Sequence, residues 1–300
     1  MTFLRPIIFF SLLLPQLSWA QESQFMEADG NLLHYRIFGT GSPLLIINGG
    51  PGMSSEGFIP LAKELSANNK VILYDQRGTG HSKMAKIDAS SMNIDLLVND
   101  LELLRKHLEL EEWIILGHSF GGMLAYAYAA KFPERVKAMI QSSSGGMDLT
   151  LFSQFDITAA LTATERDSLR FYSEKIASGD TTRATQLKRA EFLAHAYVYN
   201  KKHIPVIAKR LTQGNRTINS LLWNDMRQRN FDAKSGLQNF QKPVLILHGE
   251  NDVVNPELSH QAHQLLPGSR LVLLPNTGHY GWLDAKELYF SAISKFLSGL

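Results

Sequence analysis

Six residues, Gly117-His118-Ser119-Phe120-Gly121-Gly122, constrain the fold of this chain more than any other stretch. An apolar run rich in β-forming residues, 113–116, precedes them, and an alanine-rich run typical of a helix, 123–130, follows. A serine in a Gly-x-Ser-x-Gly pattern between a strand and a helix sits on a sharp turn that exposes its hydroxyl. The flanking glycines let strand and helix approach, because a Cβ there would clash. A glycine-rich turn with an incidental serine is the alternative, which the flanking strand and helix disfavour.

Two further residues stand where the partners of a serine nucleophile are expected. The apolar run 243–248 leads to a Gly-x-x-Asp loop that ends at Asp252, and the run 270–275 leads to His279. Both residues follow a predicted strand, at the carboxyl edge where open α/β sheets place ligands. The serine, the acid and the histidine occur along the chain in the order found in enzymes that place their nucleophile on this kind of turn. We therefore predict that His279 takes the proton of Ser119 and that Asp252 orients the imidazole.

A glycine-rich loop, Asn48-Gly49-Gly50-Pro51-Gly52, follows the apolar run 43–47. Acyl transfer requires two N–H donors aimed at the developing oxyanion. We predict that these are the backbone N–H groups of Phe120, directly after the nucleophile, and of Gly50. An ordinary Gly-Pro turn is the alternative, and the place of the loop ahead of the serine turn in the strand order disfavours it.

These segments resemble the proline iminopeptidase family of serine peptidases, within the α/β-hydrolase superfamily. That family carries a His-Gly-Gly-Pro-Gly loop, an Asp-Gln-Arg-Gly-x-Gly-x-Ser segment and a Gly-x-Ser-x-Gly-Gly turn. This chain has residues 48–52, then Asp75-Gln76-Arg77-Gly78-Thr79-Gly80-His81-Ser82, then the turn at Ser119. The resemblance covers residues 25–145 and 237–298 and implies an α/β-hydrolase that acts as an aminopeptidase on a small amide.

Two segments depart from the pattern of that family. Asn48 stands where the family usually has histidine, and an amide side chain can still brace the loop by donating and accepting hydrogen bonds. The family holds the free α-amino group of its substrate with glutamates in a cap, one of them in a Trp-Glu motif, and this chain has no Trp-Glu. Glu191, beside Phe192, is the candidate for that role, and a solvated helix glutamate is the alternative.

The alternation of predicted elements indicates an α/β fold with an insertion. A hairpin signal within residues 24–38 opens an eight-stranded, mostly parallel sheet with helices on both faces. The alternation stops after the sixth strand and resumes at Pro243, which predicts a helical cap at 146–236 between core segments 21–145 and 237–300. The remaining predicted strands are 43–48, 71–75, 113–118, 136–142, 243–248 and 270–275, and the predicted core helices are 56–67, 93–108 and 120–132.

The first twenty residues have the pattern of a secretory signal peptide. Arg5 supplies the positive charge, residues 7–14 are apolar apart from Ser11, and small residues at 18 and 20 suit cleavage. This apolar run is shorter than the roughly 20 residues that span a bilayer. We predict that residues 1–20 are removed, that the protein is periplasmic or secreted, and that the mature chain has no stable membrane insertion. An uncleaved anchor is the alternative.

Composition narrows the function further. The 300 residues, 44% of them hydrophobic, suffice for one α/β domain with an insertion. A formal net charge of +2 without a basic cluster indicates no nucleic-acid partner. The lack of cysteine excludes thiol catalysis and Cys-ligated zinc, and we expect no cofactor and no metal.

These features together predict an exported serine hydrolase that cleaves a small amide or ester through an acyl-enzyme. Its substrate is expected to be a small molecule or a short peptide. The resemblance implies a proline iminopeptidase-like aminopeptidase. A carboxylesterase or lactonase that uses the same three residues is the alternative. A ligand-binding relative without hydrolytic activity is a further one, and the intact set of serine, acid and histidine disfavours it.

Overall fold

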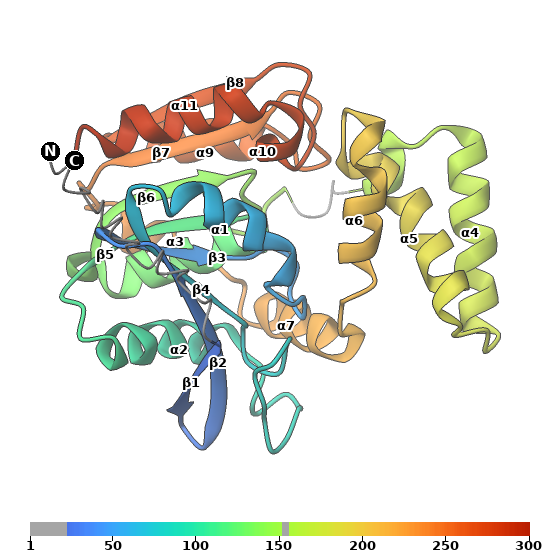
Figure 1. The fold of residues 1–300 in the computed structure, drawn as a ribbon, viewed down its shortest axis with the longest axis horizontal. Coiled ribbons are helices and arrows are strands. Elements are labelled where there is room, and N and C mark those ends of the chain that lie inside the picture. Colours follow the sequence, from blue (N-terminus) through green and yellow to red (C-terminus); the bar gives the residue numbers. More distant parts are fainter. Residues whose placement is uncertain (1–22, 152–155) are drawn as a thin grey trace, which may run out of the picture.

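The computed structural model describes residues 23–151 and 156–300 (Figure 1). The predicted signal peptide, residues 1–20, lies outside the described residues, so export stays a prediction. Within the two described stretches, every helix is too short or too polar to span a bilayer.

Eight strands form one mixed sheet in the order β1-β2-β4-β3-β5-β6-β7-β8. The hairpin strands β1 and β2 pair antiparallel with their neighbours, and all other neighbours pair parallel. This arrangement confirms the predicted eight-stranded, mostly parallel sheet. The strands are β1 Ser23–Ala28, β2 Asn31–Phe38, β3 Ser42–Ile47, β4 Asn69–Tyr74, β5 Trp113–His118, β6 Val136–Ser142, β7 Val244–Gly249 and β8 Ser269–Leu274.

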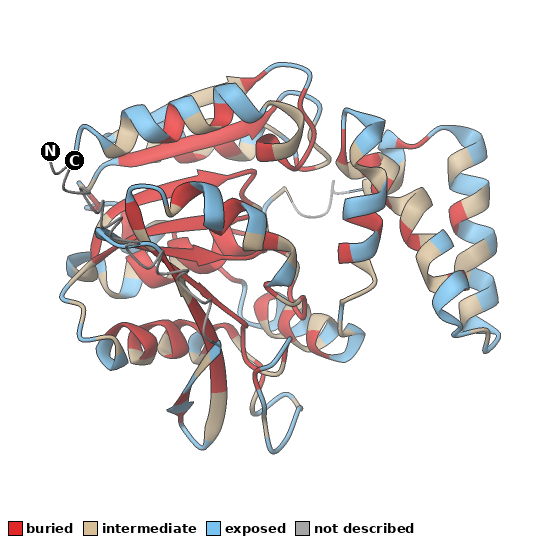
Figure 2. Ribbon diagram, in the orientation of Figure 1, coloured by how far each residue is buried: buried red, intermediate tan, exposed pale blue. Residues whose placement is uncertain are grey.

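Helices cover both faces of the sheet. Alternate residues of the central strands point to opposite faces, so Leu45 and Ile47 pack with α2 and α3, whereas Leu44 and Ile46 pack with α1 and α11. Figure 2 shows the sheet buried between these helices. The core helices are α1 Ile59–Leu65, α2 Ile94–His107, α3 Phe120–Lys131, α8 Lys234–Leu237, α9 Glu257–Leu265, α10 Gly281–Asp284 and α11 Lys286–Leu297.

A helical insert, α4 to α7, lies between β6 and β7, as the break in the sequence alternation predicts. In Figure 1, α4 and α5 lie farthest from the sheet. Of the residues of α4, only Leu169 is buried, which is consistent with a helix that has solvent on most sides. The insert consists of α4 Ala163–Ala177, α5 Arg183–Tyr197, α6 Ile204–Leu211 and α7 Arg216–Gln228.

Ser119 joins β5 directly to α3. Its backbone angles are φ 54° and ψ −120°, in a region that is strained for a residue with a Cβ. A Cβ on Gly117 would lie 2.6 Å from the carbonyl oxygen of Gly121, and one on Gly121 would lie 2.1 Å from that of Ile47. Both distances are too short for real contacts, so β3, β5 and α3 can meet at this turn only because these positions are glycine.

We expect Gly121→Ala to lower the free energy of unfolding. The added methyl group clashes with a backbone carbonyl of β3, which cannot rotate away as a side chain can. Overpacking of this kind costs about 3 kcal/mol, and the better helix propensity of alanine returns about 1 kcal/mol. Denaturant unfolding should therefore show a net loss of about 2 kcal/mol. Gly299→Ala is the matched control, because its Cβ would make an ordinary contact, 3.5 Å from the Phe296 carbonyl oxygen. Equal stability of the two variants would contradict the steric argument.

Candidate active site

His279 and Asp252 meet at the carboxyl edge of the sheet, after β8 and β7 respectively. The Nδ1 atom of His279 lies 2.7 Å from Oδ1 of Asp252, whose side chain is inaccessible to solvent. The Val254 backbone N–H donates to the same oxygen at 2.9 Å. Since a carboxylate only accepts hydrogen bonds, Nδ1 of His279 carries the proton and Nε2 is left as an acceptor.

The environment of Asp252 keeps it ionised. Burial acts to raise the pKa of this carboxyl group, but the His279 and His248 rings and the Val254 N–H favour the charged form, and the net effect is a pKa below the usual value. A buried carboxylate paired in this way stabilises a positive charge that develops on the neighbouring imidazole.

Aromatic rings pack around His279 and fix its orientation. The centroid of its ring lies 4.6 Å from that of His118 and 5.4 Å from those of Tyr197 and Tyr280. Burial, with the nearby His279 ring and the positive charge of Arg210, holds the pKa of His118 well below its usual value. His118 is therefore neutral.

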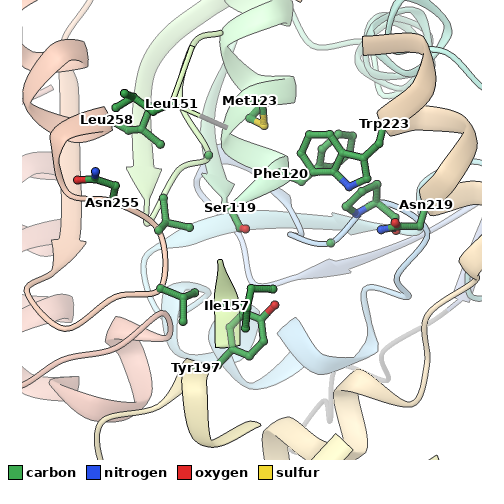
Figure 3. Close-up of a pocket in the computed structure, with 15 residues that line it drawn as sticks. Ser119, Phe120, Met123, Leu151, Ile157, Tyr197, Asn219, Trp223, Asn255 and Leu258 are labelled. Carbon is green, nitrogen blue, oxygen red and sulfur yellow. The ribbon is translucent and has the colours of Figure 1, made fainter. Parts of the chain in front are cut away.

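Ser119 lines two cavities. The first, the apolar cavity, has a volume of about 300 Å³ and is drawn in Figure 3. The second, the arginine cavity, has a volume of about 170 Å³ and is lined by Ser119 together with His279 and Arg210. The structure thus brings the predicted nucleophile and base to one cavity. Among the described residues, no aspartate or glutamate lines either cavity. The apolar side chains of the first cavity include Phe120, Met123, Leu151, Ile157, Trp223 and Leu258.

The predicted oxyanion donors lie beside Ser119. Gly50 and Phe120 both line the apolar cavity with it, and Gly50 has a φ of 74°, which suits glycine. Phe120 is the first residue of α3, where backbone N–H groups lack partners within the helix. Within the described part of the chain, neither of the two N–H groups has a protein acceptor. Both are free to bind an oxyanion.

The side chain of Asn48 braces the glycine-rich loop, as an amide at this position can. It is fully buried, and its Nδ2 donates to the backbone oxygens of Gly49 at 3.2 Å and Met53 at 3.1 Å. From the 75–82 segment, Gln76 donates to the Asn48 carbonyl at 3.0 Å, and Asp75 accepts from the Ser55 N–H at 2.8 Å. Hydrogen bonds with the side chains of Asn48, Gln76 and Asp75 therefore hold the loop that carries Gly50 in place.

The structure does not bring Glu191 to either cavity. Its side chain is on α5, about one third exposed, and forms an ion pair with Lys188 at 2.8 Å. Arg210 of α6, which the sequence analysis does not single out, lies at the site instead. It is 6% exposed, and its Nη2 donates to the carbonyl oxygen of Gly49 at 2.8 Å.

The insert is attached to the loop that carries the histidine. The His279 N–H donates to the carbonyl oxygen of Tyr197, the last residue of α5, at 2.8 Å. Asp284 of α10 accepts hydrogen bonds from backbone N–H groups on both sides of this contact, those of Tyr199 at 2.8 Å, Asn200 at 2.9 Å and Gly278 at 3.0 Å.

Residues 42–286, most of the chain, match the family described as alpha/beta hydrolase fold. Together with the sheet order and the serine turn, this match shows that the chain belongs to the α/β-hydrolase fold family.

Several curated relatives of this chain are proline iminopeptidases. That of Saccharolobus solfataricus is 29% identical over 274 residues, which are 88% of this chain and 87% of that protein. That of Heyndrickxia coagulans is 28% identical over 287 residues, 92% of this chain and 98% of that protein. The solved structure of the Mycobacterium smegmatis proline iminopeptidase shares the fold, with a TM-score of 0.73 and 23% identity over 93% of this chain and 98% of that one. The resemblance predicted from the sequence is confirmed.

Proposed function

We propose that this chain hydrolyses a small ester or amide through an acyl-enzyme on Ser119. The observation that carries the proposal is a serine on a strained turn that shares a cavity with His279, while a buried carboxylate accepts a hydrogen bond from the opposite nitrogen of that ring. This arrangement provides a nucleophile, a base and a group that orients the base.

The proposed reaction has two halves. In the first, Nε2 of His279 removes the proton of Ser119, the Ser119 oxygen bonds to the substrate carbonyl carbon, and the N–H groups of Gly50 and Phe120 stabilise the oxyanion. The bond to the leaving group then breaks, and His279 gives it the proton. In the second half, His279 takes a proton from water as the water oxygen bonds to the acyl carbon; the bond from that carbon to the Ser119 oxygen then breaks, His279 returns the proton to Ser119, and the acid leaves.

The lining of the site supports an uncharged acyl group. Side chains such as Phe120, Met123 and Trp223 favour apolar atoms, and no carboxylate of the described residues lines either cavity to pair with an ammonium. The names of the curated relatives support a second candidate, removal of an N-terminal proline that carries a free imino group. The two candidates share the acyl-enzyme and differ only in what holds the acyl part.

Trapping the acyl group tests the proposal. A short reaction with a 4-nitrophenyl ester, stopped by acid, should leave one acyl group on the protein, and peptide mapping should locate it on Ser119. An acyl group elsewhere, or turnover without a trapped acyl group in the presteady state, would count against Ser119 as the nucleophile.

A pair of amides separates the two candidates. We expect proline 4-nitroanilide with a free imino group to be cleaved no faster than its N-acetyl counterpart, because none of the described residues that line the two cavities has a carboxylate to hold the charged nitrogen. A preference of about tenfold or more for the free imino group, the size of one charge-assisted hydrogen bond, would favour the activity of the relatives instead.

A further inference from the structure

Arg210 is a buried cation that has no acidic partner among the described residues. It lies on α6, is 6% exposed, and among the described residues no carboxylate lies within ion-pair distance of its guanidinium. Burying a charge is costly unless it is paired. A buried arginine without an acid therefore requires either other compensation or a partner that arrives with the substrate.

The protein compensates Arg210 only in part. Besides the bond from Nη2 to the Gly49 carbonyl oxygen, Nη1 is 3.5 Å from the Tyr280 hydroxyl, and Nε is buried with no acceptor in the described part of the chain. The guanidinium carbon lies over the rings of Phe58 and Tyr280, at 5.0 and 5.9 Å from their centroids. These contacts use only some of its N–H donors. They hold the side chain in place and leave other N–H donors of the guanidinium available to bind an anion.

The fold makes room for this side chain. A Cβ on Gly57 would lie 2.8 Å from Cδ of Arg210, so the arginine passes where a larger residue would block it. Its guanidinium reaches the loop that holds Gly49, and a Cβ on Gly49 would lie 2.7 Å from Cβ of Ser119. The guanidinium thus binds a residue, Gly49, that packs next to the side chain of Ser119.

His279 and Arg210 share the arginine cavity, and neither lines the apolar cavity. A leaving group must accept its proton from the histidine, so it departs on the side where the arginine lies. The acyl part then occupies the apolar cavity. The bond that is cleaved therefore lies at Ser119, which lines both cavities, with the acyl part in the apolar cavity and the leaving group in the arginine cavity.

We propose that Arg210 binds a carboxylate on the leaving group of the substrate. The assignment rests on the proposed function and names its substrate class: the ester of a hydroxy acid or the amide of an amino acid. Guanidinium and carboxylate pair through parallel hydrogen bonds, which suits a planar cation in a cavity. The leaving group takes a proton from His279 when its bond to the acyl carbon breaks, and it departs as an alcohol or amine that still carries its carboxylate.

Two matched esters test the proposal on the unsubstituted protein. We expect kcat/KM for 3-acetoxybenzoate to exceed that for 3-acetoxybenzamide by about ten- to a hundredfold, the effect of a charge-assisted pair. The product 3-hydroxybenzoate should likewise inhibit competitively at about tenfold or more lower concentration than 3-hydroxybenzamide. Equal hydrolysis of both esters, or faster hydrolysis of the amide-bearing one, would overturn the proposal. This comparison needs no variant.

Variants then assign the preference to one side chain. Arg210→Met should lower the ratio of the two kcat/KM values by about ten- to a hundredfold, and Arg210→Lys should retain part of it because the charge remains. The ratio compares two substrates on one protein, so a loss of folded enzyme cancels. Arg189→Met is the control: Arg189 is also in the insert, where it contacts Ser173, and it lines neither cavity. An unchanged ratio in Arg210→Met would overturn the assignment.

The outcomes separate the two levels of inference. Turnover that depends on Ser119 but ignores the carboxylate leaves the proposed function standing and removes the role of Arg210. Absence of Ser119-dependent turnover of both esters overturns the proposed function and the role of Arg210 with it.

Discussion

Replacing Ser119 with alanine is expected to lower kcat/KM for an activated ester by about three orders of magnitude or more. The variant keeps the cavities and both oxyanion donors but has no oxygen to attack the carbonyl carbon. Labelling by a serine-directed fluorophosphonate should disappear together with turnover. Alanine keeps the Cβ that serine has, so the backbone at φ 54° is no more strained than before. Thermal unfolding should therefore be nearly unchanged.

A neighbouring serine provides the control for this experiment. Ser144 is also buried and follows β6, but it lines neither cavity. Ser144→Ala should retain labelling and most of the activity. Persistent labelling and turnover in the Ser119 variant would show that another residue is the nucleophile.

The second large effect is expected from Asp252→Asn, which should lower kcat by roughly four orders of magnitude. The amide that replaces the carboxylate can turn its NH2 group toward Nδ1 of His279. The ring then keeps its proton on Nε2, where it cannot accept one from Ser119. The variant also lacks the negative charge, buried 2.7 Å from the ring, that stabilises the imidazolium. Single-turnover kinetics with a 4-nitrophenyl ester measures the loss in the acylation step.

Glu250→Gln is the matched control, because it removes a negative charge from an exposed position two residues earlier. Its activity should stay close to that of the unsubstituted protein. The double variant of His279→Ala and Ser119→Ala adds a further check, since groups that act as a unit give losses that do not add. Additive losses, or a mild Asp252→Asn variant, would contradict the assigned roles.

The central part of the site is predictable because its constraints are local. The serine turn needs glycine at positions 117 and 121, where β3, β5 and α3 touch, and such a requirement is visible in the sequence. His279 and Asp252 each follow an apolar run, and the parallel order of the strands brings the ends of those runs together. Sequence periodicity and strand order therefore predict the sheet and the placement of these residues.

The part of the site that the insert supplies is less predictable. Glu191 follows Ala190, which is buried, but one residue along a helix turns the side chain by about 100°, and Glu191 points to Lys188 instead. Arg210 follows Ile207 by three positions, which places it beside the buried face of α6. That spacing is a signal for Arg210. It shows that a residue borders the apolar face, but only the packing of α6 against Phe58, Tyr280 and the loop at Gly49 decides that its charge is buried.

The three hydrogen bonds accepted by Asp284 limit how a protein of this kind can acquire a new substrate. They join residues 199–200, which follow α4 and α5, to the turn that holds His279. Recognition and proton transfer are thus not separate modules here, and exchanging α4 to α6 with those of a relative would also shift the imidazole. A workable exchange has to carry residues 278–284 along with the helices. Single substitutions in the apolar cavity avoid this coupling, and they are the simpler path by which such a hydrolase changes its preference.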